Sequence, residues 1–434
     1  MVKAEGLHFV YQDGTKYIPF GTTVYALAHQ SEAIIEQTMH TLEHTPFNKV
    51  RHCIFPKHYR YNHNEPQYFP FERNEEGKWD VHSPCMDYWD HFEKILVRLG
   101  EMGMETDLIL FHPYDRWGFS LLRMEEWKIY LDYLLRRLSA YPFIWWSLAN
   151  EYDLMFNRTM EEWHEIEEFV AANDCVGHLL SSHNCVHFYD FTRPNVTHCS
   201  IQTDGIHKAA EWQERYKKPV VFDECCYEGN INMAWGNISA FEMVNRFWRG
   251  CIQGSFVTHG ETYVSEDEVL WWARGGRLKG QSVPRIAFLK NILYSLPSHL
   301  SLWKEPAVMG PDDRNITATV FERPEEAYER FHALINKEER ELSQAKDACY
   351  YGQCGEQAYI KYFARQCAAL CSLTLPEDKK YEVEIIDVWE MTRTTVLEEA
   401  CGWVEVRLPG KEGIAVMAKP VSYTHLRAHE TKAN

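Results

Sequence analysis

The stretch Ile144–Asp153, IWWSLANEYD, decides how the rest of this 434-residue chain is interpreted. An apolar run typical of a buried strand ends abruptly at Asn150 and Glu151, so an amide and a carboxylate stand where the strand would meet solvent. Burying a glutamate is costly unless a partner or a function requires it. Glu151 is therefore either a general acid at the rim of a barrel or a capping, salt-bridged residue at a strand-to-helix turn.

Strand-like and helix-like segments alternate on both sides of this stretch. Eight strands are predicted, of which the fifth and sixth are the weakest: 18–25, 48–55, 105–112, 143–148, 178–182, 197–203, 219–223 and 255–259. Helices are predicted after them from apolar residues at helical spacing, such as Trp127, Tyr130, Leu131, Leu134 and Leu138. This order favours an α/β fold, a parallel (β/α)8 TIM barrel over residues 1–297, rather than a doubly wound sheet.

Beyond Pro297 the pattern changes from helical to alternating, which predicts a small antiparallel β-sandwich domain over residues 298–420. Its predicted strands are 316–321, 330–335, 358–363, 368–373, 381–388, 403–408 and 414–418. The charged segment 336–346 would be an exposed connection within this domain. Residues 421–434 follow neither pattern and resemble the translated sequencing-adaptor tail found at the ends of metagenomic reading frames, so we exclude them from the fold.

The composition is that of an ordinary globular protein, with a formal net charge of −18. That charge argues against nucleic acid and anionic membrane as partners and favours a neutral ligand, with a carbohydrate as the expected substrate. The chain shows no apolar run of signal-peptide or membrane-span length, which predicts a cytoplasmic protein. Its 13 cysteines are odd in number and lack zinc-site spacing, so we expect reduced thiols, no metal and no cofactor. A homo-oligomer is compatible with this composition.

The stretch Pro219–Gly229, PVVFDECCYEG, has the same design, because a predicted buried strand ends in Glu224. Parallel barrel strands end on one face, where TIM barrels build their active sites. Glu151 after the fourth strand and Glu224 after the seventh should then face each other across the barrel mouth. Glycoside hydrolysis requires two such carboxyl groups, about 5–5.5 Å apart in a retaining enzyme and about 6.5–9.5 Å apart in an inverting one.

The chain resembles a known class of enzymes at these positions. Five residues are similar in placement to those of the retaining clan A glycoside hydrolases, such as the family 5 barrels: Asn150, Glu151, Glu224, Arg51 inside the second strand and His112 at the end of the third. The trailing domain, with IIDVWEMT at 385–392 and LPGK at 408–411, is similar to that of the apiosidase-like barrels. Together these similarities cover nearly all of the chain up to about Pro420.

The resemblance implies that Glu151 is the acid/base and Glu224 the nucleophile of a double-displacement mechanism. Glu151 then needs a pKa raised by burial or by the neighbouring glutamate, whereas Glu224 must stay ionised. Arg51 would supply the counter-charge of Glu224, unless it is a buried arginine paired with a structural aspartate. Asn150 would bind the sugar 2-hydroxyl in the transition state.

Side chains at the other strand ends and on the loops that follow are further candidates for substrate binding. They are His112, Tyr114, Trp117, His183, Gln202, Tyr227, Trp235, His259 and Glu261. The histidines could equally be core residues, and the pair Trp271–Trp272 could pack down a loop as well as bind a sugar. His259 and Gln202 depart from the clan A pattern, which often has a tryptophan and a tyrosine at these strand ends.

The sequence thus predicts a retaining glycoside hydrolase acting on oligosaccharides or glycosides. One alternative is a carbohydrate-binding barrel that has lost catalysis, against which stand the intact Glu151, Glu224, Asn150 and Arg51. The other is a metal-dependent hydrolase, but the chain has no HExxH or comparable spacing.

Overall fold

The structure is a computed structural model that describes residues 1–267, 269–305, 330, 333–336, 338–339 and 349–421. The chain divides into two compact units, Met1–His299 and Leu300–Asn434. None of the helices in the described part of the chain is long and apolar enough to cross a membrane.

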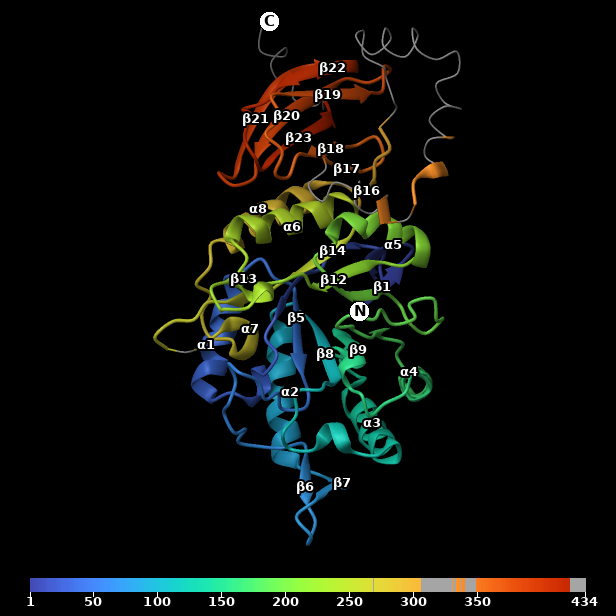
Figure 1. The fold of residues 1–434 in the computed structure, drawn as a ribbon, viewed down its shortest axis with the longest axis vertical. Helices are drawn as coiled ribbons and strands as arrows, with labels where there is room; N and C mark the ends of the chain where they lie inside the picture. The colour runs from blue at the N-terminus through green and yellow to red at the C-terminus, as the bar shows by residue number, and fades with distance from the viewer. Residues whose placement is uncertain (268, 306–329, 331–332, 337, 340–348, 422–434) are drawn as a thin grey trace, which may run out of the picture. The chain divides into compact units, whose positions relative to one another are not determined.

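The first unit is built on eight parallel strands that form a nearly closed barrel (Figure 1). The strands, in chain order, are β4 (Phe20–Thr23), β5 (Lys49–Cys53), β8 (Glu105–Phe111), β9 (Ile144–Ala149), β10 (Leu179–Ser181), β11 (Cys199–Gln202), β12 (Val220–Glu224) and β14 (Phe256–His259). They pair in the order β10-β9-β8-β5-β4-β14-β12-β11, and a parallel bridge between His183 and Ser200 brings the two ends of this sheet together. The predicted TIM barrel is therefore confirmed, with each strand inside its predicted segment or within one residue of it.

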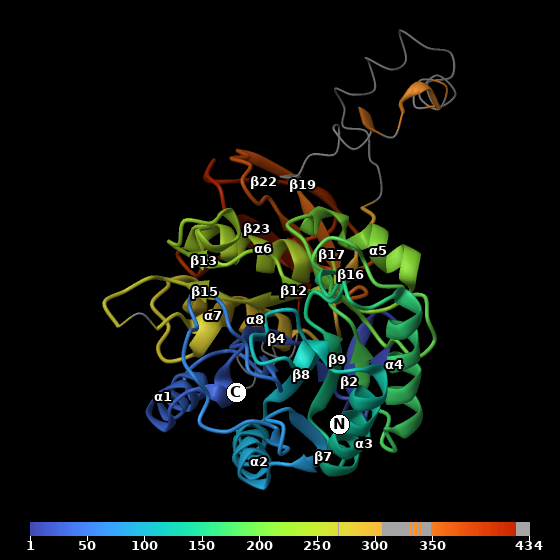
Figure 2. The ribbon, with the colours of Figure 1, turned by 60° about the horizontal axis from the view of Figure 1, so that its bottom comes forward.

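The helices follow the strands as their apolar stripes predict, except for the short helix Trp271–Arg274, which was not predicted. They are α1 (Glu32–Glu43), α2 (Met86–Glu101), α3 (Met124–Leu138), α4 (Met160–Asn173), α5 (Ala209–Tyr216), α6 (Ala240–Ile252), α7 (Trp271–Arg274) and α8 (Ser282–Ser295). The predicted stripe of α3, from Trp127 to Leu138, is fully buried, and each such side chain contributes about 1.5–3 kcal/mol. Figure 2 shows α1, α2, α3 and α4 on the outside of the strands, as the barrel requires.

Short elements complete the first unit. Its strands outside the barrel are β1 (Val2–Glu5), β2 (His8–Tyr11), β3 (Lys16–Tyr17), β6 (Phe71–Arg73), β7 (Trp79–Pro84), β13 (Glu228–Gly229) and β15 (Glu261–Thr262). Its 3-10 turns are η1 (Leu27–His29), η2 (Phe119–Leu121), η3 (Tyr152–Leu154), η4 (Ile206–Lys208) and η5 (Ala234–Gly236). Phe9 of β2 packs against Trp145 and Phe256, so the N-terminal sheet covers the ends of barrel strands opposite their carboxyl ends.

The second unit is antiparallel, which confirms the predicted β-domain. One sheet has the order β16-β17-β18-β23-β20-β21, from strands Ser301–Leu302, Tyr350–Gln353, Tyr359–Tyr362, Ile414–Pro420, Tyr381–Asp387 and Thr392–Ala400. A second pair joins β19 (Leu370–Leu375) to β22 (Gly402–Arg407). Buried residues of both, including Leu373, Val383, Val406 and Val416, share one apolar core.

Some predictions for this unit differ from the structure. In the predicted strand 330–335 the described residues Arg330, Ala333 and Leu334 are helical, so that prediction is wrong for them. The predicted strand 316–321, most of the segment 336–346 and the tail from residue 422 lie outside the described residues. Strand β21 was not predicted, because its mostly exposed sequence TRTTVLEEA lies at the sheet edge and lacks the apolar alternation that marks a half-buried strand.

Candidate active site

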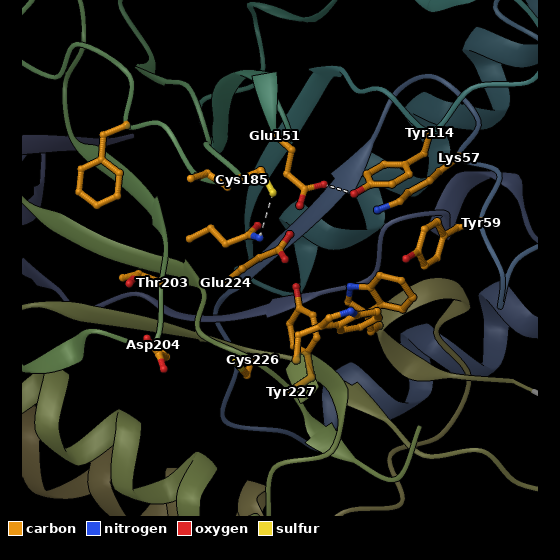
Figure 3. A pocket seen from close by; sticks show the side chains of 15 residues that line it. Lys57, Tyr59, Tyr114, Glu151, Cys185, Thr203, Asp204, Glu224, Cys226 and Tyr227 are labelled. Carbon is orange, nitrogen blue, oxygen red and sulfur yellow. Dashed lines mark hydrogen bonds between the residues drawn. The ribbon is translucent and has the colours of Figure 1, made fainter. Parts of the chain in front are cut away.

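The carboxyl ends of the barrel strands and the loops after them surround a pocket of about 450 Å³. Its lining residues are Lys57, Tyr59, Tyr114, Glu151, Cys185, Val186, Phe188, Gln202, Thr203, Asp204, Glu224, Cys226, Tyr227, Trp235 and Trp272 (Figure 3). Both predicted glutamates are among them. They enter from β9 and β12 and point toward one another across the pocket (Figure 3).

Glu151 is held by its backbone and by two side-chain donors. It follows β9 with a φ of 52°, in the left-handed region that non-glycine residues adopt only at a cost of about 1–3 kcal/mol. The Tyr114 hydroxyl donates to its Oε2, and the Asn150 amide donates to the same oxygen at 3.2 Å. Glu151 has 6% of its surface exposed and lines the pocket.

Glu224, the last residue of β12, is half-buried at the wall of the pocket. Burial raises the pKa of its carboxyl from 4.5 to about 8, and the nearby Tyr227 hydroxyl, which points toward it, offsets part of that increase (Figure 3). No cation among the described residues forms an ion pair with it. Its hydrogen-bond donor is the hydroxyl of Tyr25, at the end of the first predicted strand.

Tyr25 connects the two glutamates through Asn150. Its hydroxyl oxygen lies 2.9 Å from the Asn150 Oδ1 and also contacts the Glu224 Oε1, yet it carries a single proton to donate. When Glu224 is ionised, Tyr25 can donate to the carboxylate; when Glu224 is protonated, it can accept from the carboxyl and donate to Asn150. The direction of this bond therefore follows the protonation state of Glu224.

Arg51 does not supply the counter-charge of Glu224, so that expectation is wrong. The arginine is fully buried, its Nη1 lies 3.2 Å from the Asp107 Oδ2, and its Nη2 donates to the Asn150 Oδ1 at 3.2 Å. Asp107 is its register partner on the adjacent strand β8, which is why the two side chains meet inside the barrel. The alternative of a buried arginine paired with a structural aspartate is the observed one.

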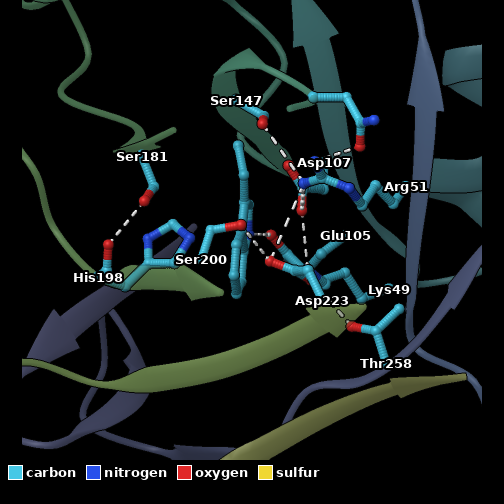
Figure 4. Close-up of polar contacts among 12 residues, drawn as sticks. Lys49, Arg51, Glu105, Asp107, Ser147, Ser181, His198, Ser200, Asp223 and Thr258 are labelled. Carbon is cyan, nitrogen blue, oxygen red and sulfur yellow. Dashed lines mark hydrogen bonds and ion pairs between the residues drawn. The ribbon is translucent and has the colours of Figure 1, made fainter. Parts of the chain in front are cut away.

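A buried network of charges lies around Arg51 (Figure 4). Lys49 donates to Asp107 at 2.8 Å and to Asp223 at 2.7 Å. Asp223, the residue before Glu224, also accepts from the hydroxyls of Ser200 at 2.6 Å and Thr258 at 2.9 Å. The charges of Lys49 and Arg51 hold the pKa of Asp223 far below its ordinary value, although burial alone would raise it. The network thereby fixes the backbone next to Glu224 and, through Arg51, the amide next to Glu151.

Four of the residues predicted to bind substrate line the pocket: Tyr114, Gln202, Tyr227 and Trp235. Neighbouring rings contact one another along one side of the pocket and form an aromatic wall, which consists of Tyr59, Tyr114, Tyr227, Trp235 and Trp272. In this wall the Trp235 and Trp272 ring centres lie 5.2 Å apart. Trp271 is buried instead and donates its Nε1–H to Thr22 at 2.8 Å. The tryptophan pair thus divides between pocket and core.

The other predicted binding residues do not line the pocket: Arg51, Asn150, His112, Trp117, His183, His259 and Glu261. His112 is buried with its Nε2 3.1 Å from the Phe55 carbonyl, and burial lowers its pKa to about 4. His183 and His259 are fully buried, and Trp117 donates to Glu65 at 2.8 Å. The geometry therefore does not support these residues as substrate contacts, because their side chains point into the core or contact a surface loop.

Glu261 belongs to a buried cluster outside the pocket. Glu228, His259 and Glu261 each offer a ligand atom within 4.8 Å of the others, as a metal site would. Both carboxylates, however, already accept the backbone N–H groups of residues 279–281, at 2.6–2.8 Å. These hydrogen bonds anchor the loop before α8. A cation bound here would have to share the carboxylate oxygens of Glu228 and Glu261 with the backbone N–H donors.

Sequence reasoning missed several pocket residues, chiefly Lys57, Tyr59, Cys185, Asp204 and Cys226. Lys57 stands two residues after the second predicted strand and Asp204 one residue after the sixth, so position after a strand was the available signal. Tyr59 and Cys185 lie farther along their loops, where one residue type at one position forms no pattern.

Two carboxyl groups that face each other at the carboxyl ends of barrel strands are an arrangement that glycoside hydrolysis uses. Residues 3–304 match the family of apiosidase-like catalytic domains, so the chain belongs to that family and is a glycoside hydrolase. Residues 347–419 match a domain of unknown function, DUF5605. No functionally curated protein matches the chain.

Solved structures agree with this assignment. A provisionally named glycoside hydrolase from Bacteroides vulgatus ATCC 8482 is 32% identical, with a TM-score of 0.82 over 97% of this chain and 82% of its own. A family 5 glycoside hydrolase from the same organism shares the fold, with 13% identity and a TM-score of 0.68 over 98% of this chain and 93% of its own.

Proposed function

We propose that the protein is a retaining glycoside hydrolase in which Glu224 is the nucleophile and Glu151 the acid/base. The observation that carries the proposal is the pair of carboxyl groups facing each other across one pocket, each with its own tyrosine donor. In the first step Glu224 would attack the anomeric carbon while Glu151 protonates the leaving oxygen. In the second, Glu151 would deprotonate the water that releases the sugar.

The reaction requires a particular protonation state of each of the two glutamates. Burial raises the pKa of Glu224 to about 8, so the carboxyl keeps its proton over most of the range below that pH. The productive form has the proton on Glu151 and a charged Glu224. The hydroxyls of Tyr25 and Tyr227 both favour that form, since each stabilises the Glu224 carboxylate.

Substrate binding would rest on the aromatic wall and on polar side chains opposite it. Tyr227, Trp235 and Trp272 can stack on the apolar faces of sugar rings. Gln202, the last residue of β11, and Asp204, on the loop after it, offer hydrogen bonds to hydroxyls. Asn150 is fixed beneath Glu151, so its role would be to orient the acid/base rather than to reach the sugar.

The test is a panel of aryl glycosides, including apiosides because of the family the chain belongs to, with the wild type, Glu151→Gln and Glu224→Gln. Each variant should lose at least about 10³-fold in kcat, as removal of a nucleophile or acid/base does. Azide should restore turnover of good leaving groups in Glu224→Ala, giving a glycosyl azide of inverted configuration. Full activity of either glutamine variant would refute the assignment.

A further inference from the structure

Lys57 carries a buried positive charge that borders the pocket. It lies four residues after β5 with 4% of its surface exposed. Its Nζ is 3.5 Å from the ring centre of Tyr25, 4.2 Å from that of Tyr114 and 5.1 Å from that of Trp272. Among the residues that the structure describes, none accepts a hydrogen bond from this ammonium or forms an ion pair with it.

The aromatic rings account for only part of what a buried ammonium needs. Each ring face can stabilise a cation by about 0.5–2 kcal/mol, but the three N–H donors still lack oxygen acceptors. An ammonium that keeps its charge here depends on acceptors in the pocket, either water or a ligand. The rings close off the sides of Lys57, so its donors can be satisfied only from the pocket, into which it points (Figure 3).

The neighbouring carboxyl groups accept hydrogen bonds from other donors, and none of the described contacts joins either of them to Lys57. Glu151 accepts from Tyr114 and Asn150, and Glu224 accepts from Tyr25. Asp204 also lines the pocket, but it lies on the far side from Lys57 (Figure 3). A ligand in the pocket can therefore bring an acceptor within hydrogen-bonding distance of the ammonium.

We propose that Lys57 forms a subsite for an anionic group of the sugar substrate, a carboxylate or a sulfate. A hydroxyl oxygen would satisfy one donor and leave the charge uncompensated, whereas a carboxylate or sulfate accepts several N–H groups and neutralises the charge. The formal net charge of −18 repels anions at long range, so selectivity for them has to come from this contact. The inference rests on the proposed function in one respect, that the pocket binds sugars.

The test measures binding without turnover, by calorimetry or saturation-transfer NMR on the full chain. Galacturonate and galactose 6-sulfate are compared with galactose, and glucuronate and glucose 6-sulfate with glucose. We expect at least one anionic sugar to bind about 10-fold tighter than its neutral partner. Preference for the carboxylate or for the sulfate identifies the group. Neutral sugars binding as tightly as both anionic forms, or no binding of any anionic sugar, would overturn the proposal.

Variants connect the preference to Lys57. Lys57→Met keeps the aliphatic stem and should bring the anionic-to-neutral affinity ratio to about 1, whereas Lys57→Arg should keep part of it. Lys78→Met, on an exposed turn, is the matched control and should leave the ratio unchanged. A ratio that survives Lys57→Met would contradict the assignment.

The pH dependence of sugar binding by the wild type tests the subsite without any substitution, so it does not depend on whether a variant folds. Burial lowers the pKa of Lys57 to about 8, so the anionic preference should decline as the pH rises through that value, while binding of neutral sugars changes less. A preference that is constant from pH 6 to pH 10 would overturn the subsite. Because binding is measured without catalysis, a Lys57-dependent preference in a protein without glycosidase activity would refute the proposed function and leave the subsite standing.

Discussion

Replacing Glu224 with glutamine should stabilise the protein while abolishing its activity. The carboxyl loses hydration in the folded state, which raises its pKa from 4.5 to about 8. The folded chain therefore binds this proton more tightly than the unfolded chain does. Stability from Glu224 is complete below about pH 4.5 and is lost as the pH rises toward 8. Glutamine has nearly the same shape, can accept from Tyr25 and carries no charge to desolvate.

The size of the effect follows from the pKa. Ionising a carboxyl whose pKa has risen from 4.5 to about 8 reduces stability by up to about 5 kcal/mol, at about 1.4 kcal/mol for each pH unit. Because Glu224 borders the open pocket, water and relaxation reduce this figure, and we expect about 1–3 kcal/mol at pH 8. At pH 4.5 the two proteins should differ by less than about 0.5 kcal/mol.

The assay measures the thermal unfolding of the wild type and of Glu224→Gln by differential scanning calorimetry at several pH values from 4.5 to 8.5. The variant should unfold at increasingly higher temperature relative to the wild type as the pH rises. Glu76→Gln, on an exposed turn, is the control and should show no such trend. A gap that is independent of pH, or a variant less stable than the wild type at pH 8, would refute the reasoning.

Three other substitutions test the surroundings of the site. Tyr25→Phe removes the donor to the Glu224 carboxylate, so the acidic limb of the pH profile of kcat/KM should move to higher pH and activity should fall about 10–100-fold. An unchanged acidic limb would show that Tyr25 does not stabilise the Glu224 carboxylate. Lys49→Met removes one of the two cations that two buried aspartates share, so it should destabilise the barrel by about 3–5 kcal/mol in urea unfolding. A loss below about 1 kcal/mol would contradict the network. Gly280→Ala places a Cβ 2.5 Å from the Glu228 carboxyl carbon, so it should lower the unfolding temperature, and a neutral effect would show that the loop before α8 can shift freely.

The barrel could be predicted because buried parallel strands are continuous apolar runs, and this chain separates them by amphipathic helices. Even the weak fifth and sixth segments contain β10 and β11. The second unit was harder, since edge strands such as β21 carry mostly polar side chains and have no apolar alternation. Its overall antiparallel character was nevertheless evident, because β20 and β23 alternate or run apolar over several residues.

For the site, the sequence located the two glutamates and the donors of Glu151, Tyr114 and Asn150, but it did not locate Tyr25, the donor of Glu224. An acidic residue directly after an apolar run is visible in one dimension, whereas the direction of a strand-end side chain depends on register, and a shift of one residue reverses it. His112, His183 and His259 therefore turned out to face the core, and Arg51 paired with Asp107 across adjacent strands. Lys57 was missed because its environment is assembled from rings far apart in the chain.

The central claim is that Glu224 becomes covalently attached to the sugar. It can be tested with a 2-deoxy-2-fluoro glycoside, with a good leaving group, of whichever sugar the panel identifies; the electron-withdrawing fluorine slows the release step. Mass spectrometry of the intact protein and of its peptides should show one added fluorosugar, on the peptide that contains Glu224, and no addition in Glu224→Gln. Turnover of this compound without a covalent adduct, or a label on another residue, would contradict the account.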